Sequence, residues 1–331
     1  MSAVNIKEVA CLAGVSPATV SRVLNGSKNV RKSTRRKVLQ AIEESGYRPN
    51  QVARGLRLRR FQSIGLVVPD ITNEFFATIA RSIEDVLHEH NYNLFLCNTR
   101  EDGEEERRYI KALLDKFVDG IIFVSGGFEE NLDLFQGDIP VVAIDRRSNL
   151  EGVSFVTSAN YEGGYLAAKH LIECGCRRIL MVRDQKQVAP MEARWAGYVD
   201  CLKDYNIPYD EGLVVSIPVE REAAREYLLR MHSQLEFDGI FAATDVLAIA
   251  CAHTLLRLGY SIPEDVQIVG FDNITAAEYY NPSLTTIAQE KEALGRKGAE
   301  LLLERIEDPE KEPATVVLPV QLIQRASTRQ Y

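Results

Sequence analysis

Residues 6–25, IKEVACLAGVSPATVSRVLN, decide the fold of the first part of the chain. Apolar residues recur there at the spacing of one helix face, and Asn5 and Glu8 are placed to form a capping box at its start. A glycine-containing turn follows. Ser16 can then cap a second helix, and Pro17 suits the first position of that helix because its missing N–H would be unpaired anyway. The pattern predicts two short amphipathic helices joined by a tight turn.

The second helix would present an outward face of small and polar residues, namely Pro17, Ala18, Ser21, Arg22 and Asn25. A face of short side chains that ends in an arginine suits the floor of a DNA major groove. A helical hairpin on the surface of an enzyme would show the same local pattern. The motif alone therefore does not separate DNA binding from an ordinary hairpin.

Charge is distributed very unevenly along the chain. Residues 1–62 contain 13 Lys and Arg against three acidic residues, a net charge of +10. Because the whole chain carries −8, residues 63–331 carry −18. A basic end on an acidic body is typical of a protein that holds the phosphates of DNA with that end alone.

Length and composition indicate a soluble protein of two or three domains. The chain has 331 residues, of which 46% are hydrophobic and 26% charged. No apolar run reaches the length of about 18 residues that a membrane helix needs. The opening residues, MSAVNIKEVA, lack the basic and apolar regions of a signal peptide. We therefore expect a cytoplasmic protein without a membrane partner.

Neither a metal nor a cofactor is expected, and an enzyme is the rival class that the sequence disfavours. The six cysteines are scattered, which predicts free and mostly buried thiols, and Cys174 and Cys176 lack the second pair that a metal site needs. The five histidines fall in no recognisable base or metal spacing. The glycine pairs at 126–127 and 163–164 are interpreted as turns rather than phosphate-binding loops.

A third helix is expected from about Arg31 or Lys32 to Ser45, with Val38, Leu39 and Ile42 facing inward. The following stretch, GYRPNQVARGLRLRR at 46–60, has too thin an apolar face for a stable isolated helix. We interpret it as a segment that becomes helical on DNA. A flexible basic linker is the alternative.

From Ser63 the pattern changes to apolar strands that alternate with amphipathic helices, in two successive series. Such alternation predicts an α/β core of two doubly wound, parallel-sheet lobes with a cleft between them, its strands buried on both faces. The predicted organisation is a helix–turn–helix domain at 1–48, a hinge at 49–62 and a core at 63–331. Within the core, lobe one covers about 63–159 and 289–315, and lobe two about 160–288 and 316–331.

Polar and aromatic residues recur where predicted strands end, which is where ligands bind in such folds. They are Asn73, Phe75, Phe76, Asp145, Arg146, Asp245, Asp272 and Gln289, with Arg194 on a following helix. Carboxylates accept hydrogen bonds from hydroxyls, arginine donates to them, and aromatic faces cover the C–H side of a sugar ring. Any one of these residues could instead be a helix cap or an ion-pair partner. Together they predict a site for a small polyhydroxy molecule.

The sequence resembles the LacI/GalR family of bacterial transcription repressors over essentially its whole length. The resemblance is carried, in this order, by VACLAGVSPATVSRVLN, GYRPNQVARGL, IGLVVPDITNEFF, AIDRR, ARWAGY, ATDVLAIA, VGFDN and LTTIAQ. It implies a homodimer, or a tetramer of paired dimers, that binds a near-palindromic double-stranded DNA operator. It also implies a core shaped like a periplasmic sugar-binding protein.

The resemblance implies individual DNA contacts by their place in the motif. Pro17, Ala18 and Arg22 are implied to contact the bases. Ser16, Thr19 and Ser21 are implied to contact the phosphates. Leu56, flanked by Ala53 and Arg54, is implied as a wedge between two base pairs at the operator centre, which would bend the DNA.

For the effector, the resemblance is to the sugar-responsive branch, with site chemistry similar to that of ribose binders. One departure is Thr244, where ribose binders often carry Asn, and a fructose- or sucrose-linked ligand is the next expectation. A nucleobase corepressor and a catabolite-control regulator that binds a phosphorylated carrier protein are the alternatives. The Asp145-Arg146 pair counts against the second, because those regulators lack it. Sugar binding is expected to change the lobe orientation and so lower DNA affinity.

Overall fold

The computed structural model describes residues 4–24, 27, 29–47, 60–100, 102–124, 131, 134, 139–145, 152–186, 188–231 and 236–330. The chain divides into two compact units, Met1–Phe61 and Gln62–Tyr331. Five of the predicted contact residues lie outside the described residues: Asn25, Ala53, Arg54, Leu56 and Arg146. Most of the predicted hinge lies outside them as well.

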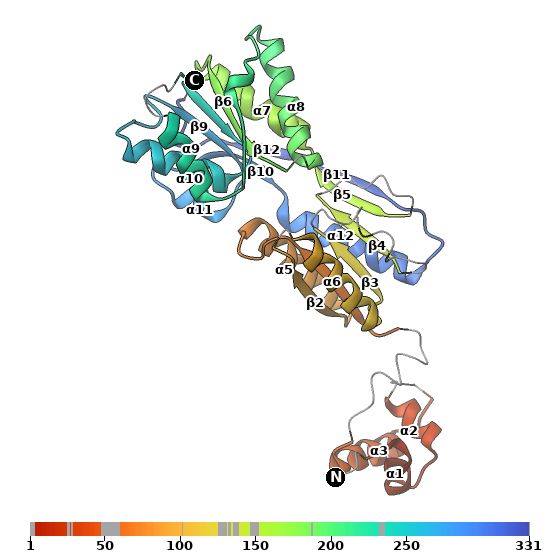
Figure 1. Ribbon diagram of the computed structural model, residues 1–331. Coiled ribbons are helices and arrows are strands. Elements are labelled where there is room, and N and C mark those ends of the chain that lie inside the picture. The colour runs from red at the N-terminus through yellow and green to blue at the C-terminus, as the bar shows by residue number, and fades with distance from the viewer. Residues whose placement is uncertain are drawn as a thin grey trace. The chain divides into compact units, whose positions relative to one another are not determined.

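The described residues of the first unit form a bundle of three short helices (Figure 1). They are α1 (Ile6–Ala13), α2 (Pro17–Leu24) and α3 (Lys32–Ser45). Val9, Val20 and Val38 are fully buried where the helices meet. The expectation for Leu39 is wrong, because its side chain is 51% exposed and Ala41 is buried instead. At 3.6 residues per turn, Ala41 shares the inner face with Val38 whereas Leu39 is rotated away from it.

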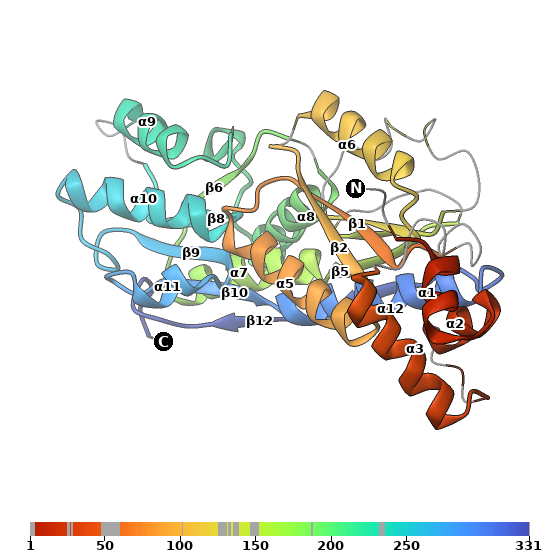
Figure 2. The ribbon, with the colours of Figure 1, turned by 90° about the horizontal axis from the view of Figure 1, so that it is seen from below.

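The first lobe of the core is built on a parallel six-stranded sheet in the order β11-β5-β4-β3-β1-β2 (Figures 1 and 2). Its strands are β1 (Ser63–Val68), β2 (Asn93–Asn98), β3 (Gly120–Phe123), β4 (Val141–Ile144), β5 (Ser154–Ser158) and β11 (Thr315–Leu318). Helices α5 (Glu74–Glu89) and α12 (Lys291–Glu307) pack on one face of the sheet, and α6 (Gly103–Asp115) packs on the other.

The second lobe has a six-stranded sheet in the order β12-β10-β9-β8-β6-β7, in which only β12 is antiparallel. Its strands are β6 (Ile179–Asp184), β7 (Val214–Ile217), β8 (Gly239–Ala242), β9 (Gln267–Asp272), β10 (Thr285–Gln289) and β12 (Val320–Ile323). Helices α7 (Asn160–Glu173) and α8 (Ala189–Asp204) cover one face. Helices α9 (Arg221–Met231), α10 (Asp245–Arg257) and the short α11 (Thr275–Tyr279) cover the other.

The chain passes from the first lobe to the second for the last time beyond the expected boundary between residues 315 and 316. Val316 pairs with Val156 of β5, so β11 belongs to the first sheet through Leu318. The apolar run TVVLPVQLI hides this crossing in the sequence, because only Pro319 interrupts it. Proline cannot donate to a strand ladder, and the chain changes sheets there.

Most strands are buried on both faces, as their unbroken apolar runs predict; β1 and β9 are buried along their full length. The prediction is wrong for β2, where Phe95 is 39% and Leu96 46% exposed. The reason is the place of β2 at the edge of the first sheet.

The glycine pair at 163–164 is not a turn, because both residues lie within α7. Of the six cysteines, Cys11 alone is exposed and the others are buried free thiols. Among the described residues, no helix has the length and apolar character to cross a membrane. The same residues contain no cluster of three or more His, Cys, Asp or Glu side chains suited to a metal ion.

Candidate functional site

The capping box of the first helix is present. The Asn5 side-chain oxygen accepts hydrogen bonds from the backbone N–H groups of Lys7 at 2.9 Å and Glu8 at 3.2 Å. The Glu8 carboxylate accepts in return from the Asn5 backbone N–H at 3.1 Å. Gly14 ends α1 at φ 61°, a conformation that costs glycine little. These local contacts set where α1 begins and where the chain turns toward α2.

The second helix begins as predicted. The Ser16 hydroxyl accepts a hydrogen bond from the Thr19 backbone N–H at 3.2 Å, and Pro17 is the first helical residue. Val20 and Val23 are buried on its inner face. Pro17, Ala18 and Arg22 are exposed on the outer face, and Thr19 and Ser21 are half-buried. The face that would read DNA is therefore presented to solvent.

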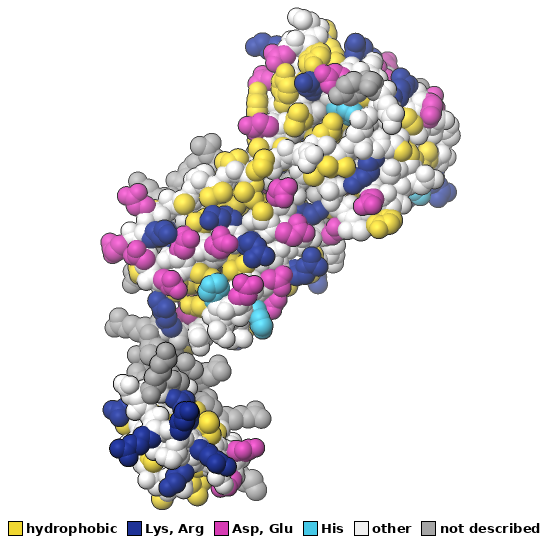
Figure 3. Space-filling view, turned by 180° about the vertical axis from the view of Figure 1, so that it is seen from behind, with side chains coloured by type: hydrophobic (Ala, Val, Ile, Leu, Met, Phe, Trp, Pro, Cys, Tyr) yellow, Lys and Arg dark blue, Asp and Glu magenta, His cyan; other side chains and the backbone are white. Residues whose placement is uncertain are grey.

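Basic side chains gather on this helical unit (Figure 3). They include Lys7, Arg22, Arg31, Lys32, Arg36 and Lys37, all exposed. On the face of the core shown in the same view, acidic and basic side chains are interspersed. On the side drawn in Figure 3, the described surface of the helical unit is thus mostly basic and that of the core is mixed.

In the core, a cavity of about 110 Å³ lies between the two lobes. Seven of the ten predicted effector residues line it: Asn73, Phe75, Phe76 and Asp145 from the first lobe, and Arg194, Thr244 and Asp272 from the second. The Phe75 and Phe76 rings meet edge to face with centroids 5.3 Å apart. The structure therefore brings together residues that are as much as 199 positions apart, from Asn73 to Asp272.

Arg194 is the most deeply buried charge of the cavity. Its guanidinium donates to the Asn160 side-chain oxygen at 2.8 Å and to the Ala243 carbonyl at 2.6 Å. It also lies 3.7 Å from the centroid of the Phe271 ring and 3.9 Å from an Asp272 oxygen. Burial lowers the pKa of Arg194 and the nearby Asp272 carboxylate raises it. These contacts hold the guanidinium in one orientation beside the cavity.

Asp272 ends strand β9 with a left-handed φ of 109°. One carboxylate oxygen accepts a hydrogen bond from the Gln289 side chain at 2.7 Å. Burial raises the pKa of Asp272 to about 6, against the opposing effect of Arg194. Gln289 is not among the cavity-lining residues, so it acts on the cavity through Asp272 rather than directly.

Asn160, the first residue of α7, was missed by sequence reasoning. Its side-chain oxygen accepts from Arg194, and its amide donates to an Asp145 oxygen at 3.3 Å. It therefore links the carboxylate of one lobe to the guanidinium of the other. The signal was present, because Asn160 follows a strand end as the predicted residues do.

Asp245 does not line the cavity, contrary to the expectation. Its carboxylate is fully buried and accepts hydrogen bonds from the Ile274 backbone N–H at 2.9 Å and the Thr286 hydroxyl at 2.6 Å. Burial raises its pKa to about 8. Asp245 thus anchors the turn after β9. Its neighbour Thr244 does line the cavity and caps α10 by accepting from the Leu247 N–H at 3.3 Å.

Sequence reasoning also missed several lining residues. They are Pro69, Asp70, Val124, Asp184, Val188, Pro190, Met191 and Val219. Asp70 and Asp184 follow strand ends and could have been found by the rule applied to the others. The apolar residues carry no chemical signal in the sequence, because they face the cavity only through the packing of the lobes.

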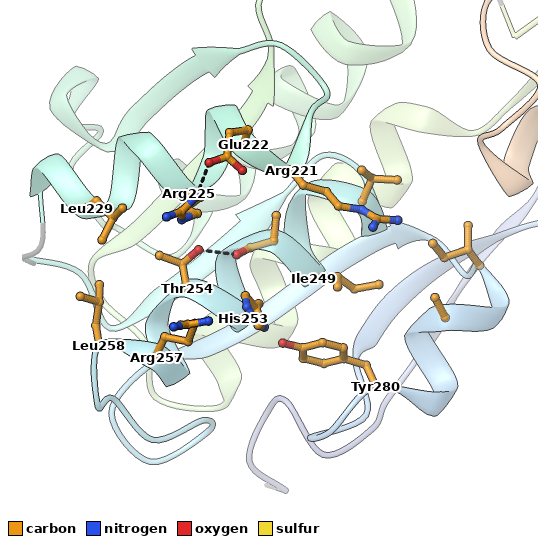
Figure 4. Close-up of a pocket in the computed structure, with 14 residues that line it drawn as sticks. Arg221, Glu222, Arg225, Leu229, Ile249, His253, Thr254, Arg257, Leu258 and Tyr280 are labelled. Atoms are coloured by element: carbon orange, nitrogen blue, oxygen red, sulfur yellow. Dashed lines mark hydrogen bonds and ion pairs between the residues drawn. The ribbon is translucent and has the colours of Figure 1, made fainter.

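A larger open pocket of about 790 Å³ lies on the second lobe (Figure 4). Helices α9, α10 and the segment around α11 form its walls, and the Tyr280 ring points toward His253. None of the predicted effector residues lines it. Because all its walls belong to one lobe, a ligand there would not bridge the lobes. The smaller cavity is therefore the better candidate for an effector site.

Comparison with known proteins matches both units. A sequence profile described as "Bacterial regulatory proteins, lacI family" matches residues 5–50, and one described as "Periplasmic binding protein-like domain" matches 168–328. The chain is 40% identical over 327 residues to a protein named ribose operon repressor from Halalkalibacterium halodurans, covering 98% of this chain and 97% of the relative.

Two further relatives carry names that bear on the ligand. The chain is 36% identical over 305 residues to the HTH-type transcriptional repressor PurR of Haemophilus influenzae, covering 91% of this chain and 90% of the relative. A LacI-family regulator from Enterococcus faecium, solved with bound ribose, matches with a TM-score of 0.72 and 36% identity. That match covers 80% of this chain and 98% of the solved one.

Proposed function

Because the chain belongs to the LacI family of bacterial regulatory proteins, we propose that an unphosphorylated pentose of the ribose type releases it from its operator. The chain is a DNA-binding transcriptional repressor with a small-molecule effector. Its relatives are repressors rather than enzymes, and we propose that this chain is not an enzyme either. It would act on DNA in the cytoplasm and control carbohydrate-utilisation genes.

The observation that carries the proposal is the cavity between the lobes. Its lining combines carboxylates, an arginine and the edge-to-face pair Phe75 and Phe76. Carboxylates accept hydrogen bonds from sugar hydroxyls, and aromatic faces pack on the C–H side of a sugar ring. The volume of about 110 Å³ is that of a single small molecule.

The charge of the lining supports an uncharged sugar rather than a sugar phosphate. Four carboxylates, those of Asp70, Asp145, Asp184 and Asp272, line the cavity, against Arg194 as the one cation among the described lining residues. Arg194 already donates to Asn160 and Ala243. A phosphate group would therefore meet several negative charges in a partly desolvated space, where like-charge repulsion is strong.

We attribute release of the repressor from its operator to the position of the site between two lobes. A sugar that contacts Asp145 on one lobe and Asp272 on the other stabilises the lobe orientation that brings these residues together. Only this difference in affinity between orientations can shift the equilibrium. We propose that the favoured orientation separates the DNA-binding units of a dimer, with a coupling of roughly 1–3 kcal/mol, which is typical of allosteric proteins.

We further propose a homodimer that places two α2 helices in successive major grooves of a near-palindromic operator. Strand β2 supports this, because its Phe95 and Leu96 are exposed at the edge of the first sheet. An exposed apolar sheet edge in a monomer would favour uncontrolled pairing. A second copy would cover it.

The test uses the full-length protein and a symmetric operator selected from random double-stranded DNA. D-Ribose should release the operator, whereas D-ribose 5-phosphate and hypoxanthine should not. Substitution of Asp272→Asn should raise the ribose concentration for half-release by about 10- to 100-fold, because a hydrogen bond to a charged acceptor is lost. DNA affinity without ribose should remain.

Asp85→Asn, an exposed change on α5, is the matched control and should respond like the wild type. Stronger operator binding with hypoxanthine would replace the sugar proposal with that of a nucleobase corepressor, in line with the PurR relative. Release by ribose 5-phosphate alone would contradict the charge argument.

A further inference from the structure

Two residues of the first lobe hold one short segment of the second. The segment runs from Asp272, the last residue of β9, to Thr275, the first residue of α11. The Glu74 carboxylate accepts hydrogen bonds from the Thr275 backbone N–H at 2.8 and 2.9 Å and from the Thr275 hydroxyl at 2.8 Å. The Lys291 ammonium donates to the carbonyls of Asp272 at 3.1 Å and Asn273 at 2.5 Å.

The two holding residues begin two helices that pack closely against each other. Glu74 is the first residue of α5 and Lys291 the first of α12, and both helices pack on the sheet of the first lobe. A methyl group on Gly295 of α12 would lie 2.5 Å from the Ile79 carbonyl of α5, so the two helices touch closely. The segment 272–275 is therefore fastened to a rigid part of the first lobe.

The hydrogen bonds made by Lys291 and those made by Glu74 differ in their exposure to water. Lys291 is 7% exposed, and its partners Asp272 and Asn273 have left-handed φ values of 109° and 52°. It lies at the crossover from β10 to α12, where the chain itself joins the lobes. Glu74 is half-buried and Thr275 exposed, so water can replace their hydrogen bonds. Water therefore competes more strongly for the Glu74 contact than for the Lys291 contact.

Both sides of the Glu74 contact adjoin the cavity. Asn73, next to Glu74, and Asp272, at the other end of the segment, both line it. A ligand that bridges Asn73 and Asp272 therefore requires a particular lobe orientation. The contact between Glu74 and Thr275 requires the same orientation. By thermodynamic linkage, each then strengthens the other.

We propose that Glu74 is a positioning residue whose hydrogen bonds to Thr275 latch the two lobes in the ligand-binding orientation and so set the sensitivity of the repressor to its effector. The inference rests on the proposed function only for the identity of that effector. The latch itself concerns the ligand-free protein and has its own measurement.

The first measurement uses full-length, ligand-free protein. Glu74→Ala and Glu74→Asp should speed hydrogen exchange of the Thr275 amide about three- to tenfold, because its carboxylate acceptor is removed or drawn out of reach. Both variants should also increase the radius of gyration measured by small-angle X-ray scattering. Glu74→Asp keeps the negative charge at the start of α5, which separates the latch from the helix-dipole effect. Glu84→Ala removes an exposed carboxylate from the same helix and should change neither quantity.

The second measurement is the D-ribose concentration that half-releases the operator. It should rise about three- to tenfold in both Glu74 variants, because the binding-competent orientation is less populated. Affinity for the operator without ribose should stay equal or increase. In a Glu74→Ala, Thr275→Ala double variant, the loss of ribose sensitivity, expressed as a free energy, should be smaller than the sum of the losses in the two single variants. The reason is that the two residues share one contact.

Unchanged Thr275 exchange or an unchanged radius in the Glu74 variants would overturn the latch. Faster exchange with an unchanged ribose midpoint would overturn its role in effector sensitivity. If ribose does not release the wild type, the sugar proposal fails by itself, and the ligand-free measurements still decide whether Glu74 latches the lobes.

Discussion

At the residue scale, the cavity depends on buried charges that are held by neutral partners. Asn160 joins Asp145 to Arg194, and Gln289 donates to Asp272, so each charged group meets a fixed amide. A buried charge without such partners would be strongly destabilising. These side chains of the cavity are therefore held in fixed orientations, which would reduce the ordering that a ligand must impose.

The raised pKa of Asp245 predicts that the stability of the protein depends on pH. Burial raises its pKa from 3.8 to about 8, so the folded state holds this proton more tightly than the unfolded state. Its contribution to stability is then fully present below about pH 4 and is lost as the pH rises toward 8. Relative to Asp245→Asn, the wild type should lose on the order of a few kcal/mol over this range.

Chemical denaturation of both proteins at a series of pH values measures this difference. Asp85→Asn, which changes an exposed carboxylate, should keep the pH profile of the wild type. Parallel profiles for the wild type and Asp245→Asn would show that the Asp245 carboxyl has an ordinary pKa.

At the element scale, α7 and α8 meet through glycines. A methyl group on Gly164 of α7 would lie 2.0 Å from the Arg194 carbonyl oxygen of α8, and one on Gly197 would lie 2.1 Å from the Tyr161 carbonyl. The backbones therefore touch at both places. This contact sets the height of Arg194 above the sheet and its distance from Asn160 on α7.

Gly164→Ala should force the two helices apart. Overpacking of this kind costs about 1–3 kcal/mol, and we expect a lower free energy of unfolding together with a weaker response to ribose as Arg194 moves. Urea denaturation and operator release measure the two effects. Glu162→Ala, an exposed change on the same helix, should show neither. A destabilised Gly164→Ala protein with a normal ribose midpoint would mean that α7 and α8 do not position the guanidinium.

At the scale of the whole molecule, the exposed edge of the first sheet supports the proposed homodimer. Phe95 is 39% exposed on β2, and the Lys116 ammonium lies 5.6 Å from its ring centroid. An apolar surface of this kind contributes to association once a second copy removes it from water. Dimer formation would also bring two DNA-reading helices to one operator.

Phe95→Glu should weaken the dimer by placing two like charges in an apolar contact. Sedimentation should shift toward the monomer, and operator affinity should fall at least tenfold because one reader then binds alone. Tyr209→Glu changes an exposed aromatic residue of the second lobe and should leave both unchanged. A Phe95→Glu protein that sediments like the wild type would place the contact between copies elsewhere.

Sequence alone determined the features that depend on neighbours along the chain. The capping box of Asn5 and Glu8 and the start of α2 at Pro17 are local hydrogen-bond and dihedral preferences, which do not depend on the rest of the fold. The alternation of strands and helices likewise follows from burial periodicity, and the rule that ligands lie beyond strand ends located seven of the fifteen residues that line the cavity.

Only the tertiary structure decided the features that depend on residues distant along the chain. It left Asp245 out of the cavity lining, linked Asn160 to Arg194, placed Gly164 of α7 against α8 and assigned β11 to the first sheet. It also brought Glu74 to Thr275 across 201 positions. Packing and topology set such distances, and neither is written in the local pattern of residues.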